Sequence, residues 1–229
     1  MKDSRQGTYH RGARANPLAQ FGIIPIGFGA LADVFRGYKS PADKIAALER
    51  DGELVRLKRG VYLVSGDIHG KTFSRELVAN HLYGPSYVSL ESALAHHGLI
   101  PERVHVVRSM TTRRGRRFST PLGVFDYVTA PADYHAIGIT QLVVENEYAC
   151  LIASPEKAVC DMIVATRGLR LQSPGAVRVW LEEDLRVDFA AVRAFDIEII
   201  RQCAGASEKK KAELRHFHNL LKQLNPPKT

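Results

Sequence analysis

Apolar and polar residues recur with helical spacing between Ser40 and Gly52, in the sequence SPADKIAALERDG. Ser40 is a favourable N-cap, Pro41 suits the first helical position, and Asp43 stands where a capping box places a carboxylate. Gly52 ends the helix that this pattern predicts. Its two sides differ in character: one carries Ile45 and Leu48, and the other carries Asp43, Ala47 and Arg50, with Lys44 beside them.

A β-hairpin is predicted directly after this helix. Residues 53–57 and 61–64 are rich in β-forming side chains, and Lys58-Arg59-Gly60 provides the turn between them. A second helix is expected upstream over residues 28–37, with an apolar stripe formed by Leu31, Val34 and Phe35. Two helices followed by a basic hairpin are typical of a winged helix-turn-helix. The preceding stretch, FGIIPIG, indicates extended chain rather than a separate first helix.

The rest of the chain predicts a mixed region of strands and helices. A polar connector over residues 65–72 leads to helices expected over residues 73–83 and 89–97. Strands are expected in residues 104–112, on either side of Pro121–Gly123, and in residues 137–144 and 148–152. Ser154-Pro155 and Ser173-Pro174 repeat the helix-start signal of Ser40-Pro41, and further helices are expected within residues 189–203 and 207–224.

The predicted fold class is therefore α+β. We expect a disordered basic arm over residues 1–20 and a winged helix-turn-helix over residues 21–68. A second domain is expected over residues 69–229, strand-rich over 100–152 and helical over 154–225.

The 229 residues carry a formal net charge of +8, and this excess is uneven. Residues 1–72 hold 12 Lys and Arg against 7 Asp and Glu, whereas residues 73–150 hold 7 of each. The net positive charge is largest in the segment that contains the winged-helix pattern, which favours a polyanionic partner. Three cysteines without a CxxC pair favour a reducing compartment. Because no apolar run approaches the roughly 20 residues of a membrane span and the N-terminus lacks a signal-peptide pattern, we expect a cytoplasmic protein.

The pattern assigns DNA contacts to the predicted helix and hairpin. We expect Lys44, Ala47 and Arg50 to face the major groove, where the short Ala47 side chain cannot read a base by hydrogen bonding. Phosphate contacts, which position a protein without specifying sequence, are expected from Lys39, Lys58 and Arg59.

The densest basic cluster lies outside this region, at Arg113-Arg114-Gly115-Arg116-Arg117. These four arginines are candidate contacts to nucleic acid or to an acidic protein surface. The alternative is a solvated hairpin tip whose charges keep a sheet edge from pairing. Residues 209–211, all lysines, are expected to form a hydrated face.

Enzymatic and metal chemistry finds little support in the sequence. Gly70-Lys71-Thr72 follows a strand, but Ser65 replaces the first glycine that a phosphate-binding P-loop requires. Neither His96-His97 nor the pair His216 and His218 has metal-ligand spacing. The candidate carboxylates Glu91, Glu156 and Asp161 are explained by their places near helix starts. We expect no catalytic residues, metal or cofactor, and the prediction is that the protein is not an enzyme.

Three segments resemble the AbiEi-family antitoxins of type IV (abortive infection) toxin–antitoxin systems. They are KIAALERDGELVRLKRGVYLV, YGPSYVSLESALAHHGLIPERVHVVRSMTTRR and ASPEKAVCDMIVAT, and with the flanking helices they lie within residues 26–205. The resemblance implies a winged helix that represses its own promoter by binding inverted repeats. It also implies a C-terminal domain that counteracts a nucleotidyltransferase-like toxin, with or without direct binding, and a homodimer on DNA.

By position, the family's DNA-contacting helix corresponds to Ser40–Asp51 and its wing to Arg56–Tyr62. The resemblance thus adds three residues to the expected DNA contacts: Ser40, Arg56 and Tyr62. Asp43, on the exposed side of the same helix, completes that set. Two alternative functions stay open. One is a transcription factor with a ligand-sensing C-terminal domain, and the other is an enzyme acting on nucleotides or on the toxin.

Overall fold

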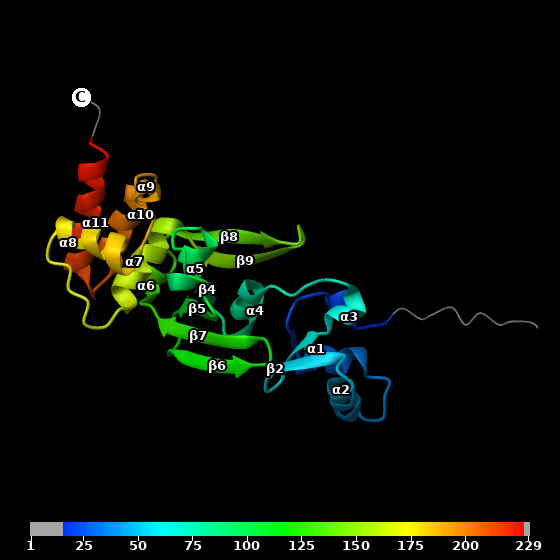
Figure 1. Cartoon of the computed structure of the whole chain (residues 1–229). Helices are drawn as coiled ribbons and strands as arrows, with labels where there is room; N and C mark the ends of the chain where they lie inside the picture. Colours follow the sequence, from blue (N-terminus) through cyan, green and yellow to red (C-terminus); the bar gives the residue numbers. More distant parts are fainter. Residues whose placement is uncertain (1–15, 227–229) are drawn as a thin grey trace, which may run out of the picture.

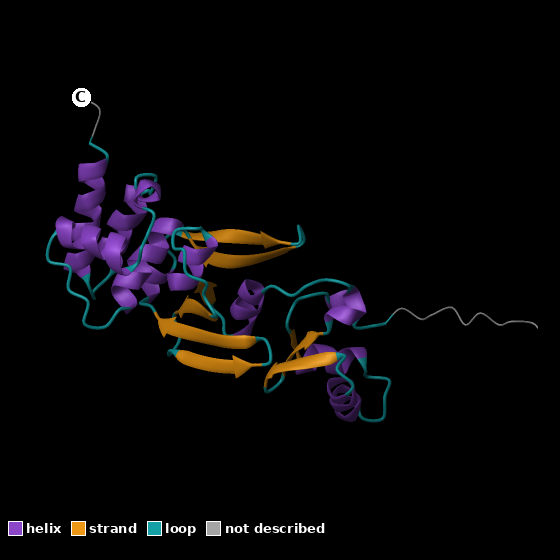
Figure 2. Ribbon diagram, viewed as in Figure 1, coloured by secondary structure: helices purple, strands orange, loops and turns teal. Residues whose placement is uncertain are grey.

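The chain folds into two β-sheets flanked by helices, and the expected α+β class is confirmed. The structure, a computed structural model, describes residues 16–226. Figure 1 shows a small region at the N-terminal end, a larger sheet in the middle and a group of helices at the C-terminal end. Figure 2 shows that the strands occupy the centre of the molecule while most helices gather at the C-terminal end. In the described part of the chain, no helix combines the length and the apolar character that crossing a membrane would require.

The N-terminal region is built from two helices and a small sheet. It contains η1 (Ala19–Phe21), β1 (Ile26–Gly27), α1 (Phe28–Val34), α2 (Pro41–Arg50), β2 (Leu54–Lys58) and β3 (Val61–Val64). The strands form an antiparallel sheet in the order β1-β3-β2. Both expected helices and the hairpin are confirmed, although α1 ends earlier than predicted. Their core is formed by Leu18, Ile26, Leu31, Phe35, Ile45, Leu48, Leu54, Tyr62 and Val64.

Most of the expected basic arm, residues 1–15, lies outside the described residues. For residues 16–20 that expectation is wrong. Leu18 is completely buried in the N-terminal core, and the Asn16 side chain donates a hydrogen bond to Glu53 at 3.1 Å. The ordered fold therefore begins before residue 21, because an apolar side chain within the polar segment finds a place in the core.

The expected polar connector contains a single helical turn, α3 (Gly66–His69), which the sequence pattern did not predict. Gly70, with φ 72°, ends this single turn in the left-handed conformation that glycine adopts without steric cost. The helix predicted next is confirmed as α4 (Arg75–Leu82), and the Ser74 hydroxyl accepts a hydrogen bond from the Leu77 amide as its N-cap.

The larger sheet has six strands in the order β6-β7-β5-β4-β9-β8. These are β4 (Ser86–Val88), β5 (Val106–Thr111), β6 (Arg116–Thr120), β7 (Gly123–Thr129), β8 (Ile139–Val144) and β9 (Tyr148–Ala153). Two antiparallel hairpins, β6–β7 and β8–β9, form its edges, and β5 pairs with β7 in parallel. The strands expected from the sequence are confirmed, but β4 is additional, since three buried residues show no alternation that a sequence pattern could reveal.

Eight helical segments complete the described part of the larger region. They are α5 (Leu90–His96), α6 (Ala132–His135), α7 (Pro155–Ala165), α8 (Pro174–Val179), η2 (Trp180–Asp184), α9 (Phe189–Val192), α10 (Ile197–Ala206) and α11 (Lys211–Leu224). Lys210 precedes α11 in a left-handed conformation, which delays the helix start predicted at Ser207. Its ammonium also donates to the Leu169 carbonyl, so the expected hydrated lysine face is wrong for Lys210.

The β2–β3 hairpin lies between the two hydrophobic cores and contributes side chains to both. Tyr62 and Val64 point into the N-terminal core, whereas the alternating residues Leu57 and Leu63 belong to the large core beneath the six-stranded sheet. Both faces of the hairpin are therefore covered, and only its turn and its edge remain open to solvent.

Candidate nucleic-acid interface

The exposed side of α2 is the first element of the candidate interface. The Ser40 hydroxyl accepts a hydrogen bond from the Asp43 amide at 3.3 Å, which satisfies a free amide at the helix start. Ile45 and Leu48 are buried on the opposite side. Asp43 and Arg50 are exposed, Lys44 and Ala47 are partly exposed, and the Arg50 side chain is 77% accessible. The predicted division of α2 into a core side and a solvent side is confirmed.

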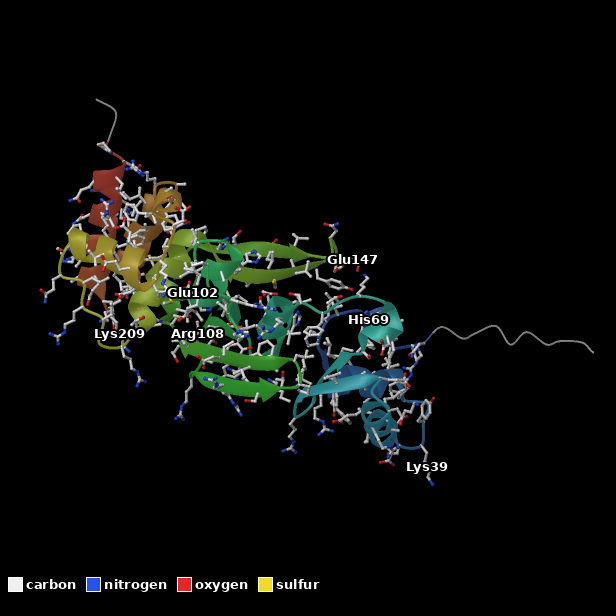
Figure 3. All side chains as sticks on the ribbon, viewed as in Figure 1. Lys39, His69, Glu102, Arg108, Glu147 and Lys209 are labelled. Atoms are coloured by element: carbon white, nitrogen blue, oxygen red, sulfur yellow. The ribbon has the colours of Figure 1, made fainter. Side chains whose placement is uncertain are left out.

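A shallow hollow lies at the N-terminal end of α2. It is lined by Tyr38, Lys39, Ser40, Asp43 and Lys44. Tyr38 is 55% exposed, and the Lys44 ammonium lies 5.8 Å from the centre of its ring. Figure 3 shows Lys39 pointing away from the body of the protein beside this helix. An aromatic ring with two neighbouring ammonium groups is suited to a polyanion that presents both charge and flat surfaces.

The two basic residues of the hairpin turn have different environments. Arg59 is exposed, and Gly60, with φ 75°, allows the tight turn. Lys58 instead donates a hydrogen bond to the Leu82 carbonyl at 2.5 Å. Burial, followed by the nearby charges of Arg116 and Arg113, lowers the pKa of Lys58. A bulge between Arg56 and Lys58 shifts the strand register at this point. The phosphate contact expected from Lys58 stays a prediction, and its ammonium is tied to the last residue of α4, unlike the exposed Arg59.

Two further residues that were expected to contact DNA, Arg56 and Tyr62, make contacts that stabilise the N-terminal region. Arg56 forms an ion pair with Glu49 of α2 at 2.5 Å, and this hydrogen bond raises the pKa of the guanidinium. The Arg56 guanidinium lies 5.4 Å from the ring centre of Tyr62, which is only 4% exposed. The prediction that Tyr62 contacts DNA is wrong, because its ring fills the N-terminal core. Arg56 is half-exposed but already neutralised by Glu49, so it ties β2 to α2.

All four residues of the arginine cluster, Arg113, Arg114, Arg116 and Arg117, are exposed, but they do not form a hairpin tip. β5 and β6 are not neighbours, because β7 lies between them. The expectation of a solvated tip is therefore wrong, while β6 is indeed an edge strand. Arg113 and Arg116 lie close enough to Lys58 to lower its pKa.

A buried polar cluster lies in the larger region, and sequence reasoning missed it. Lys157 and Asp161, one turn apart on α7, form an ion pair at 3.2 Å with both side chains inaccessible. Asp161 accepts hydrogen bonds from the hydroxyls of Tyr87 at 3.0 Å and Ser89 at 2.6 Å, and Lys157 donates to the Tyr134 carbonyl at 3.0 Å. Burial raises the pKa of Tyr87 and Tyr134, so both phenols stay protonated. These groups hold β4, α6 and α7 together.

The three carboxylates that were expected near helix starts make different contacts. Glu156 accepts a hydrogen bond from the N-cap Ser154, which fits the prediction. Nη1 of Arg108 donates hydrogen bonds to both carboxylate oxygens of Glu91. For Asp161 the prediction is wrong, since it lies in the middle of α7 and is the partner of Lys157. The signal for this pair was available as Lys and Asp four residues apart in a helix that is otherwise mostly apolar.

The remaining motifs are explained by local contacts. Lys71 of the P-loop-like segment forms an ion pair with Glu147 at 2.5 Å. His97 lies 2.8 Å from the Ala153 carbonyl, as expected for an inward-facing residue, and His96 is exposed. Cys150, Cys160 and Cys203 are free and buried. Within residues 16–226, no group of three or more His, Cys, Asp or Glu side chains could hold a metal ion.

These features define a mixed α+β protein. No protein-family model matches the sequence, and no curated protein matches it. The fold is similar to that of the RV2827C protein from Mycobacterium tuberculosis, known from a crystal structure. The TM-score is 0.58 at 16% sequence identity, and the match covers 92% of this chain and 75% of that chain. At this identity the likeness concerns the fold alone.

Proposed function

We propose that this protein is a DNA-binding repressor whose N-terminal region acts as a winged helix-turn-helix. The observation that carries the proposal is the open side of α2 together with the exposed Arg59, which directly follows the strand β2 on which α2 packs. A helix presented on a small packed sheet that ends in a basic turn suits a major groove and the phosphates along its edge.

Exposure and side-chain partners support a narrower set of DNA contacts within this proposal. Ala47 and Arg50 lie on the open side of α2, with Lys44 at its border, and Arg50 alone has a long side chain that is free to read a guanine edge. Lys39 and Arg59 are the exposed phosphate contacts, while Lys58 is tied to α4 and Arg56 and Tyr62 have structural roles. Specific recognition by one copy of the protein therefore depends on few base contacts. A second copy bound to the other half of an inverted repeat would supply the rest.

The antitoxin role is proposed on the resemblance to AbiEi-family antitoxins. In this proposal the larger region counteracts a nucleotidyltransferase-like toxin, with or without direct binding, and the protein acts in the cytoplasm. The segment that resembles the family most specifically, GPSYVSLESAL, supplies Tyr87 and Ser89 of the buried cluster. Its polar residues thus support the fold of the antitoxin region rather than catalysis.

A titration of the protein against the DNA upstream of its own gene, at two salt concentrations, tests the repressor proposal. A scrambled duplex of equal length is the control. We expect tighter binding to the upstream DNA. Arg50→Ala should remove most of that preference, whereas Arg59→Ala should weaken binding to both duplexes and reduce the salt slope by about one unit. Equal affinity for the two duplexes would contradict a sequence-specific repressor.

A transcription factor with a ligand-sensing region is the second candidate, and one cavity favours it. This cavity of about 390 Å³ lies between the loop after α5, the start of β5 and the end of η2. Its walls combine apolar residues with charged ones: Ile100, Val104, Val106 and Leu185, with Glu91, Glu102, Arg108 and Asp184. Co-expression with the product of the neighbouring gene separates the candidates, since a ligand sensor would not rescue growth.

A further inference from the structure

A cluster of cations and aromatic rings joins the hairpin to the edge of the six-stranded sheet. We name it the hairpin-side cluster; it consists of Lys58, Tyr83, Arg113, Arg116 and Phe118. β2 contacts β6 directly. In Figure 1 the two strands follow one another end to end along the lower edge of the molecule, with α2 below β2. The N-terminal region and the edge of the larger sheet therefore present one continuous border.

Three cations share two rings within the cluster. The Tyr83 and Phe118 rings lie 5.5 Å apart. Arg113 stacks over Tyr83 at 4.9 Å and Arg116 over Phe118 at 4.9 Å, while the Lys58 ammonium lies 5.4 Å from Phe118. The rings and the Leu82 carbonyl hold these cations in place, so both guanidinium groups are positioned before any partner arrives.

Within the described residues, no carboxylate forms an ion pair with this cluster. None of the ion pairs formed by residues 16–226 includes Lys58, Arg59 or any of the four clustered arginines. Like charges gathered without a counterion destabilise one another, and a partner with closely spaced negative charges relieves that repulsion. Protection of a sheet edge would need only scattered charge, not three cations around one aromatic pair.

The strand register separates two adjacent arginines. Arg116 pairs with Tyr127 and Arg117 with Asp126, so the two side chains lie on opposite faces of the sheet. Arg116 thereby shares a face with Phe118 and lies next to the hairpin. Arg117 lies on the other face, beside an acidic residue, and is a matched control of equal type and exposure.

We infer that Arg113 and Arg116 bind the phosphate backbone of double-stranded DNA beyond the segment held by α2 and Arg59. This inference rests on the proposed repressor function and extends it to the larger region of the protein. The DNA would run from the exposed side of α2, past the hairpin turn, to the edge strand β6. These contacts add affinity and length of binding site but no base readout.

The test uses the full-length protein and two duplexes from its own upstream DNA. The short duplex covers only the segment bound by α2 and the hairpin, and the long one extends it on the hairpin side by about one helical turn of ~10 base pairs. The wild-type protein should bind the long duplex more tightly. Arg116→Gln should weaken long-duplex binding about three- to tenfold and reduce its salt slope by about one unit, while short-duplex binding stays unchanged. Arg113→Gln/Arg116→Gln should reduce the slope by about two units.

Arg117→Gln is the control and should leave both affinities unchanged. Equal effects of Arg116→Gln and Arg117→Gln would overturn the inference, because general charge would then explain the loss. Unchanged DNA binding with lost toxin neutralisation would also overturn it and assign these arginines to a protein partner. Wild-type binding that is specific but independent of duplex length would refute this inference alone, whereas no specific binding to either duplex would refute the repressor proposal as well.

Discussion

The helices α2 and α7 begin with the same signal and reach opposite environments. Each starts with a serine N-cap followed by proline, and in each the serine hydroxyl accepts a hydrogen bond from the amide three residues on. One side of α2 is open to solvent, and its Arg50 forms only a long contact with the neighbouring Asp51. By contrast, eight residues of α7 are buried, including Glu156, Lys157 and Asp161.

The comparison shows that the environment, rather than the residue type, decides what a charged side chain does. Lys44 at the border of the open side of α2 is half-exposed, whereas Lys157 of α7 is inaccessible and bonded to Asp161 and to the Tyr134 carbonyl. An exposed charge without a firm partner costs little in folding and is available to another molecule. A buried charge stabilises the fold only as long as its partner is present.

The largest effect is expected from breaking the buried pair. Lys157→Met leaves Asp161 charged and without its ion-pair partner in the core, so the free energy of unfolding should fall by about 3–5 kcal/mol. Urea unfolding followed by circular dichroism measures this change. The double variant Lys157→Met/Asp161→Leu removes both charges and should recover a large part of the loss. If the single and double variants were equally unstable, the cost would arise from packing and not from the unpaired carboxylate.

A smaller loss of stability, similar in size for both helices, is expected from removing the two N-caps. Ser40→Ala and Ser154→Ala each remove one hydrogen bond to a free helix amide, so each should cost about 1 kcal/mol of stability. Thermal unfolding of the two variants provides the measurement, with Ser40→Asp and Ser154→Asp as replacements that retain a cap. A difference of several kcal/mol between the two alanine variants would show that burial of α7 adds a cost that the cap alone does not explain.

The sequence predicts α2, the hairpin and the cap at Ser40 well, because these features depend on residues within a few positions of one another. The strands of the β6–β7 and β8–β9 hairpins were also predictable for this reason. β4 was not, since its three residues are buried on all sides and its partners, β5 and β9, lie about 20 and 60 residues later. Short buried strands carry no periodic signal of their own.

The roles of individual side chains were less predictable than the elements that carry them. Tyr62 and Lys58 belong to the predicted hairpin, but their contacts depend on which face of the hairpin meets each core. The link between Asp161 and Tyr87 likewise joins residues 74 positions apart. Long-range contacts of this kind follow from the packing of the whole chain, which a local pattern does not encode.

Removing an exposed charge from α2 should have almost no effect on folding. Arg50→Ala should change the free energy of unfolding by no more than about 0.5 kcal/mol, because the side chain is 77% accessible. In the same protein, specific DNA binding should weaken about tenfold or more. Chemical denaturation and the DNA titration, performed on one preparation, separate these effects. Loss of stability equal to that of Lys157→Met would contradict the contrast between the helices.

The smallest effect is expected from acid, and it should originate in the larger region. Burial and then the positive charge of Lys157 lower the pKa of His135, whose ring lies 4.9 Å from that of Tyr87. Below the unfolded-state pKa of about 6.5, the unfolded chain takes up a proton that the folded chain does not, so stability falls as the pH drops from about 7 toward the lower folded-state pKa. His135→Gln should make thermal stability less dependent on pH between 7.5 and 5.5.

His105→Gln, at an exposed site, is the matched control and should keep the wild-type dependence. Desolvation also lowers the pKa of His81 and His218, which contribute their own pH dependence, so the comparison uses the difference between each variant and the wild type. An identical pH dependence for His135→Gln and wild type would mean that the buried cluster tolerates a charged imidazole beside Lys157. In that case the buried cluster would tolerate a further charge. It would then differ from the open side of α2 only in how much a charged side chain costs there.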